Sequence, residues 1–256
     1  MNERFLTFAI AAAACWLGGL LLLRTERRRG AGIALYVVGV ALLATYALLL
    51  WRGLGRPPMR TLGETRLLYA ILLPAVACGV SLRWRIHWPM AYGAAMAVVF
   101  LGINLARPEA FDKTLMPALQ SPWFVPHVVV YILAYAFLTA SALGAARFFV
   151  TGDDTLPACD HAVWIGLSFL TMGLLFGALW AKEAWGHYWT WDPKETWAFL
   201  TWAIYLGYIH IRLRHSQARR FAAGFLLAAV AILGTCWFGV NYLPSAKTSV
   251  HTYTQP

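Results

Sequence analysis

The chain has 256 residues, of which 60% are hydrophobic and 12% are charged, and its formal net charge is +10. A soluble domain of this length could not bury so much apolar surface, so the composition predicts an all-α, polytopic membrane helix bundle. The charge does not indicate nucleic acid as a partner. The arginines gather in short loops between apolar stretches, where they orient a protein in the lipid bilayer.

Eight apolar stretches meet or approach the length of about twenty residues that a membrane span needs. They lie at residues 5–23, 31–51, 67–82, 89–106, 125–150, 161–182, 195–213 and 221–240. The third is short and needs residues from Leu62 onward. The first has only Arg4 as a positive charge before it and no small-residue cleavage site, so we expect a retained span. The sequence therefore predicts about eight transmembrane helices in a single integral membrane domain, residues 1–256.

The orientation follows from short arginine-rich loops, at residues 24–29, 83–85 and 212–220. All three fall on one side of an eight-span arrangement, and the positive-inside rule makes that side cytoplasmic. Counted over all connections, eleven lysines and arginines lie inside and ten outside, so the prediction depends on the density of charge in the short loops. Both termini are then expected on the outer side.

Two further segments and the cysteines carry local signals. Residues 52–66 contain glycines and prolines and are expected to lack regular structure, with Glu64 and Arg66 explained by an ion pair or by solvation. Ser121 precedes Pro122, a pair typical of an N-cap and first helical position. The four cysteines are scattered without a Cys-x-x-Cys pair, which disfavours thiol redox chemistry and zinc binding.

Residues 185–195 combine three tryptophans with a helix start, and we call this segment the tryptophan shelf. It reads Trp185-Gly-His-Tyr-Trp189-Thr-Trp191-Asp192-Pro-Lys-Glu195. Asp192 is the expected N-cap, Pro193 the first helical residue and Glu195 the reciprocal capping partner. Indole faces, helix-end N–H groups and Lys194 suit a large flat apolar ligand with acidic edges. Interfacial anchoring is the alternative role of such tryptophans, and their dense spacing favours the ligand-binding role.

The shelf, together with Thr196 and Trp197 after it, resembles the tryptophan-rich WWD signature of the haem-handling proteins of cytochrome c biogenesis. Its Asp-Pro-Lys-Glu ending is most similar to the CcsA/ResC branch, which belongs to System II. The similarity continues in Ser121-Pro-Trp-x-x-Pro-His127 and in Asn241-Tyr-Leu-Pro-Ser, which leads to His251. Residues 1–60 hold two spans without a motif, and residues 61–256 hold the CcsA-like core.

Two histidines, His127 and His251, form the best axial pair for a haem iron, since the expected topology puts both on the outer side beside the shelf. They also match the two external haem ligands of the CcsA-like family. A frayed tail is the alternative account of His251. His210 lies fifteen residues beyond Glu195 on one helix, about 22 Å deeper, and cannot share that iron.

The resemblance assigns His210 to an inner haem site, whose opposite ligand comes from a CcsB/ResB-type partner. A histidine at headgroup depth is the competing account of that residue. The other histidines are expected in surface positions: His87, His161, His187 and His215.

The resemblance implies a haem-binding protein of the bacterial inner membrane that moves haem b outward. Haem would be presented on Trp185, Trp189 and Trp191 for covalent attachment to Cys-x-x-Cys-His of apocytochrome c. Together with the partner, the chain would form a holocytochrome c synthase, or haem lyase. No catalytic residue is assigned, because no nucleophile triad or paired carboxylates occur at usable spacing. A haem chaperone or exporter, a b-type electron-transfer cytochrome and a haem-free transporter are the alternatives.

Overall fold

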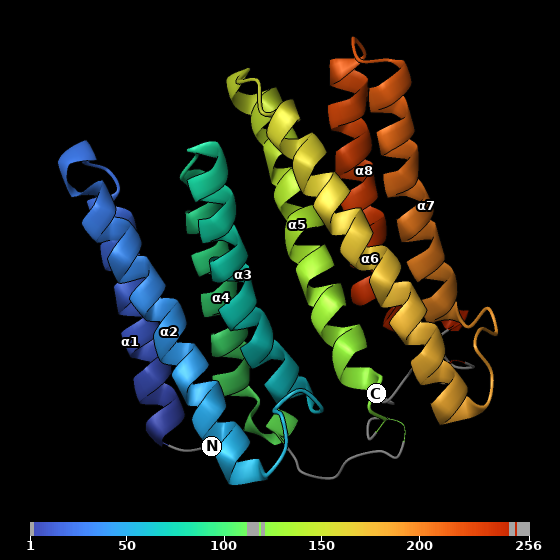
Figure 1. The fold of residues 1–256 in the computed structure, drawn as a ribbon, viewed down its shortest axis with the longest axis horizontal. Coiled ribbons are helices and arrows are strands. Elements are labelled where there is room, and N and C mark those ends of the chain that lie inside the picture. The colour runs from blue at the N-terminus through green and yellow to red at the C-terminus, as the bar shows by residue number, and fades with distance from the viewer. Residues whose placement is uncertain (1–2, 112–117, 119–120, 246–248, 250–256) are drawn as a thin grey trace. The chain divides into compact units, whose positions relative to one another are not determined.

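The computed structural model describes residues 3–111, 118, 121–245 and 249, and these include eight α-helices (Figure 1). The helices are α1 (Glu3–Leu22), α2 (Arg29–Leu54), α3 (Leu62–Trp84), α4 (Trp88–Ala106), α5 (Phe124–Thr151), α6 (Leu156–Trp185), α7 (Pro193–Arg214) and α8 (Arg219–Trp237). Short 3-10 turns lie between α1 and α2, after α4 and after α8.

The all-α membrane bundle predicted from the sequence is confirmed, and each predicted span overlaps one helix. Within the part of the chain that the structure describes, seven helices are long and apolar enough to cross a membrane. The eighth, α7, has 22 residues and carries charged side chains in its first and last turns. Helix α3 begins at Leu62, as its short apolar stretch required, so the connection between α2 and α3 is shorter than the expected 52–66. The orientation of the termini stays a prediction.

The chain divides into two compact units, Met1–Gln120 with α1 to α4 and Ser121–Pro256 with α5 to α8. Whether they form one integral membrane domain stays a prediction. In the first unit, small residues let α1 and α2 approach closely, since a Cβ at Gly19 would lie 2.7 Å from the carbonyl oxygen of Gly32. The Tyr36 hydroxyl donates to the Met90 carbonyl at 2.7 Å and joins α2 to α4.

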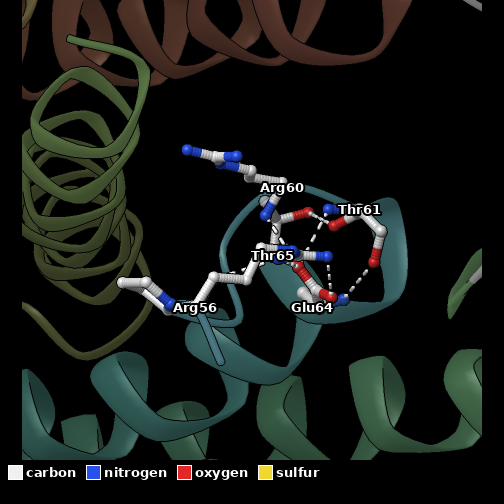
Figure 2. A network of polar contacts seen from close by, with 6 residues as sticks. Arg56, Arg60, Thr61, Glu64 and Thr65 are labelled. Atoms are coloured by element: carbon white, nitrogen blue, oxygen red, sulfur yellow. Dashed lines mark hydrogen bonds and ion pairs between the residues drawn. The ribbon is translucent and has the colours of Figure 1, made fainter. Parts of the chain in front are cut away.

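A buried carboxylate closes the start of α3, as Figure 2 shows. Thr61 is the N-cap and forms a capping box with Glu64, which is 2% exposed. The two carboxylate oxygens of Glu64 accept hydrogen bonds from both terminal nitrogens of Arg56 at 2.9 Å each. The backbone N–H of Arg60 donates to the same carboxylate at 2.8 Å. Glu64 therefore takes part in an ion pair, but its partner is Arg56 and not Arg66, with which it was considered in the sequence.

The substitution Glu64→Ala is expected to destabilise the first unit by about 3 kcal/mol, because it leaves the Arg56 guanidinium and two backbone N–H groups without their buried acceptor. Thermal unfolding in detergent micelles, followed by circular dichroism, measures the effect. Glu26→Ala is the matched control, since the Glu26 side chain is 89% exposed in its pair with Arg29 and its loss should leave the midpoint unchanged. Equal midpoints for the two variants would contradict the role assigned to Glu64.

In the second unit a polar clamp holds α7 against α6. The Asp160 carboxylate accepts hydrogen bonds from the Tyr208 hydroxyl at 2.7 Å and from the Arg212 guanidinium at 2.8 Å on each of its oxygens. Closer to the other end of these helices, the Trp202 indole N–H donates to the Thr171 hydroxyl at 2.9 Å. These contacts fix the rotation of α7, and so decide which of its side chains face the core.

Candidate functional site

The tryptophan shelf begins where α6 ends and finishes at the first turn of α7. Gly186 caps α6 with a φ of 86°, a left-handed conformation that glycine adopts without strain. Helix α7 begins at Pro193 with Asp192 as its N-cap, and the Asp192 carboxylate accepts a hydrogen bond from the Lys194 N–H at 3.0 Å. The capping box between Asp192 and Glu195 is present. The helix start predicted from the sequence is confirmed.

Glu195 stabilises the loop that carries the tryptophans. Its carboxylate oxygen Oε2 accepts the backbone N–H groups of Thr190 at 2.8 Å and of Asp192 at 3.1 Å, although the side chain belongs to α7. Asp192 and Glu195 are both buried. These two carboxylates therefore fix the loop and the helix start, while Lys194 lies half-buried beside them.

The three indoles of the shelf lie in two groups. Trp185 packs edge-on against Trp180 of α6, with ring centroids 4.9 Å apart. Trp189 and Trp191 make a second edge-to-face pair at 5.7 Å, and Trp191 also contacts Phe199 of α7. Trp191 has a φ of 60°, unusual for a bulky residue, and is 62% exposed. The loop thus exposes one large apolar ring to water, and the backbone that carries this ring is strained.

His127 lies in the first turn of α5 and packs into a notch on α6. Its ring nitrogen Nδ1 lies 2.9 Å from the Gly173 carbonyl oxygen, so Nδ1 carries the proton that is donated there. A Cβ at Gly177 would lie 2.8 Å from the ring, which shows how closely the imidazole approaches the α6 backbone. The ring also contacts Tyr131 at 4.6 Å and Trp180 at 5.4 Å between centroids.

The expected N-cap role of Ser121 is wrong. Helix α5 begins at Phe124, with Trp123 at the N-cap position, and residues 121–123 form a turn. The Ser121 hydroxyl accepts the Trp123 N–H at 3.2 Å and donates to the Glu183 carboxylate at 2.7 Å. The serine therefore joins the entrance of α5 to the end of α6 instead of capping the helix.

Trp180 is a site residue that the sequence analysis missed. It lies between His127 and Trp185 and joins the histidine to the shelf through ring contacts. A lone tryptophan within an apolar helix is typical of core packing. The available signal was the spacing of Gly173, Gly177 and Trp180, which puts two small residues and one large ring on a single face of α6.

The C-terminal tail also reaches the shelf. The Ser249 hydroxyl donates to the Asp192 carboxylate oxygen Oδ1 at 2.9 Å, the same oxygen that accepts the Lys194 N–H. His251 follows two residues later and lies outside the described residues. The contact places Ser249 against the N-terminus of α7.

His210 is not part of this group. It is exposed on α7, whereas Tyr205, Tyr208 and Ile209 are buried and face the core of the second unit. The ring therefore projects away from that core, on the helix that begins at the shelf and four turns or so beyond it. His187, within the shelf loop, is exposed as expected.

Comparisons with known proteins identify the family of this chain. The family model described as cytochrome C assembly protein matches residues 6–246. The cytochrome c biogenesis protein CcsA of Synechococcus sp. (strain RCC307) is 31% identical over 265 residues, which cover 86% of this chain and 84% of the relative. The protein of the same name from Chlamydomonas reinhardtii is 34% identical over 168 residues, covering 60% of this chain and 47% of its own length.

Among solved structures, the cytochrome c haem lyase CcmF superimposes with a TM-score of 0.67. The match has 19% sequence identity and covers 94% of this chain but 50% of CcmF, so it shows a shared fold. The family match covers nearly the whole chain, including the first two helices that carry no motif. The chain therefore belongs to the cytochrome c assembly protein family, in which it is of the CcsA type, and its function lies in cytochrome c biogenesis.

Proposed function

We propose that this protein holds haem b against the tryptophan shelf on the outer face of the inner membrane and presents it to apocytochrome c, with His127 and His251 as the axial ligands. The observation that carries the proposal is the convergence of three distant segments in the second unit. His127 contacts Trp180, Trp180 contacts Trp185, and Ser249 is hydrogen-bonded to Asp192.

The chemistry of His127 fits an iron ligand. A ligating imidazole is neutral and commonly donates its second N–H to a backbone carbonyl, which fixes the tautomer and the ring direction. Donation from Nδ1 to the Gly173 carbonyl leaves the lone pair of His127 on Nε2. The positive charge of Lys194 favours the haem propionates, and the exposed Trp191 offers a ring face for the porphyrin.

In this proposal the protein contributes position, and haem is its substrate. The two imidazoles hold the iron, and the indoles hold the ring so that its vinyl groups remain accessible to the Cys-x-x-Cys-His motif. Each cysteine thiol then adds across one vinyl double bond, forming one carbon–sulfur and one carbon–hydrogen bond. The motif's own histidine displaces one of the two axial imidazoles, and the product leaves.

His210 belongs to a second haem position nearer the cytoplasmic side. Because its ring projects from α7 away from the core of the unit, a ligand on the opposite face of that haem must come from outside this unit. A CcsB/ResB-type membrane protein is the proposed source. The complex of the two proteins would then act as the holocytochrome c synthase.

The variant Trp189→Ala tests the shelf. We expect haem affinity to fall about twofold to tenfold, which corresponds to the free energy of one aromatic contact, while membrane insertion stays normal. The Soret absorbance per purified protein, recorded with and without co-expressed partner, measures occupancy. Trp164→Ala is the matched control, because Trp164 is an exposed tryptophan elsewhere on α6. An unchanged haem spectrum in Trp189→Ala would show that the shelf indoles serve only as interfacial anchors.

A further inference from the structure

A groove of about 370 Å³ lies in the first unit, between the end of α1 and the start of α4. Most of its wall is apolar and is formed by Leu17, Leu20, Leu21, Leu23 and Ala91. Arg24, which is exposed, brings a positive charge to one end. Because α1 ends at Leu22 and α4 begins at Trp88, both helices place their polar ends beside this charge. The groove therefore changes from charged to apolar along its length.

The dimensions of the groove suit a single hydrocarbon chain. Arg24 and Leu17 are seven residues apart, about 10 Å along α1, which is about one third of the hydrocarbon core of a bilayer. Over this length the volume corresponds to a width of about 7 Å, which is narrower than a helix of about 10–12 Å in diameter. Leu17 and Leu21 are 62% and 50% exposed, so the groove is open at its side. A chain can therefore enter from the surrounding lipid.

Neither His87 nor Trp88 offers a polar side-chain atom to an occupant of the groove. Both residues line it, but the ring nitrogens of His87 and the indole nitrogen of Trp88 are buried. The expectation that His87 occupies a surface position is wrong for the same reason. The side chains of the groove therefore recognise a ligand through apolar surface and through guanidinium charge.

The positive charge at this end exceeds what nearby carboxylates neutralise. The chain around the α1–α2 and α3–α4 connections holds six arginines and one glutamate: Arg24, Arg27, Arg28, Arg29, Arg83, Arg85 and Glu26. Glu26 pairs with Arg29, whereas no carboxylate among the described residues pairs with Arg24 or Arg85. Burial lowers the pKa of His87 and the positive charge of Arg29 lowers it further, so the two connections lie close together. Arg24 and Arg85 can therefore bind an anion from outside the chain.

Arg85 occupies a position that disfavours a side chain. It is the C-cap of α3 and has a φ of 55°, the left-handed conformation that glycine usually supplies at a helix end. Orientation in the bilayer requires positive charge in this short connection, but not at this one residue. Arg85 precedes His87 by two residues, so its Cα lies within about 7 Å of a residue that lines the groove. A bound anion gives a physical reason for an arginine here.

We propose that this groove binds a phospholipid with an anionic headgroup. One acyl chain lies along Leu17, Leu21 and Ala91, and the phosphate lies against Arg24, with Arg85 as a second charge. Arginine binds a phosphate through two parallel hydrogen bonds, so both ends of the lipid are recognised. A free phosphate ion would leave the apolar wall uncovered, and a helix of another protein is wider than the groove. The inference uses neither haem nor the tryptophan shelf, so it is independent of the proposed function.

The test is a titration of the purified full-length protein with dioleoyl phosphatidylglycerol or dioleoyl phosphatidylcholine, in which native mass spectrometry counts the lipids retained. We expect the first phosphatidylglycerol to bind at least about fivefold more tightly than the first phosphatidylcholine, whose headgroup carries its own cation. Arg24→Gln should weaken the binding of phosphatidylglycerol about fivefold, and Arg24→Gln/Arg85→Gln about twentyfold. Arg52→Gln, which changes an exposed arginine in the last turn of α2, is the matched control and should change nothing. Equal affinities for the two lipids, or an Arg24→Gln protein that behaves like the control, overturn the inference.

A second pair of variants tests the position of the acyl chain. Ala91→Phe fills the groove without a change of charge and should weaken the first adduct of either lipid about tenfold, which corresponds to about two methylene groups that lose their burial. Ala41→Phe adds the same ring at an exposed alanine of α2 that does not line the groove, and should have no effect. Added phosphatidylglycerol should raise the thermal midpoint of the wild type but not that of Ala91→Phe, and the midpoint without lipid shows whether each variant is folded. An Ala91→Phe protein that binds both lipids as the wild type does would refute the proposed site.

Two other outcomes would assign the groove to a different occupant and so overturn the inference. Inorganic phosphate that displaces phosphatidylglycerol from the protein would make the groove a site for a free anion. Release of a co-purified membrane protein by Ala91→Phe, with the lipid adduct unchanged, would make it an interface between proteins.

Discussion

Replacing His127 by alanine is expected to reduce holocytochrome c formation to the level of cells that lack the protein. The substitution removes one axial ligand together with the ring that packs between Trp180 and Tyr131. Haem then has at most one ligand at the shelf, and its position relative to the apocytochrome is no longer fixed. Haem staining of membrane and periplasmic cytochromes c measures the yield, and the Soret band of the purified variant measures the haem retained.

The matched control is His187→Ala, which changes an exposed histidine in the shelf loop and should leave the yield near that of the wild type. His127→Gly with added imidazole should recover part of the haem spectrum, because a small ligand fits the vacated space. Normal cytochrome maturation in His127→Ala would refute the axial role of this residue. A spectrum that imidazole does not restore would assign His127 to packing alone.

A second large effect is expected at Gly177, a residue without chemistry of its own. A Cβ added there would lie 2.8 Å from Cε1 and 2.9 Å from Nδ1 of His127, closer than carbon and ring atoms pack. The ring has to shift, which stretches the hydrogen bond from Nδ1 to the Gly173 carbonyl. A misplacement of about 1 Å at a reacting centre costs about 100-fold in rate. We expect Gly177→Ala to lower the cytochrome yield at least about tenfold, and Gly177→Val to lower it further.

Helix propensity alone predicts the opposite effect, since alanine in place of glycine within a helix otherwise stabilises the helix by up to about 1 kcal/mol. Gly224→Ala on α8, where a Cβ meets nothing within 4 Å, should thus leave yield and thermal stability equal or slightly higher. Comparison of the haem spectra separates displacement of His127 from unfolding. A Gly177→Ala protein with wild-type yield would show that the position of the imidazole is not critical.

Helices and their beginnings could be read from the sequence where a local signal decides them. Apolar length fixes a span, since backbone groups in lipid must be satisfied within the helix, and all eight predicted spans overlap helices. The capping box of α7 follows from four consecutive residues. Ser121 shows the limit of this reasoning, because its hydroxyl is engaged by Glu183, 62 residues away, and the helix begins later.

The site itself depended on contacts between distant segments. The roles of Trp180 and of the notch at Gly173 and Gly177 arise only when α5 lies against α6. Similarly, His87 follows a basic loop and is expected at the surface, yet packing of α1 beside α4 buries its nitrogens. Sequence spacing indicates which residues share a helix face, but not which neighbour that face meets.

At Trp191 the backbone conformation lowers stability, while the side chain is the one proposed to contact haem. The left-handed conformation found at this position destabilises a residue that has a Cβ by roughly 1–2 kcal/mol, whereas glycine adopts it almost without penalty. Glycine, however, has no ring to offer. In the proposed function the porphyrin contact offsets this local conformational penalty, so the protein without haem carries a strained residue at the surface where haem is expected to bind.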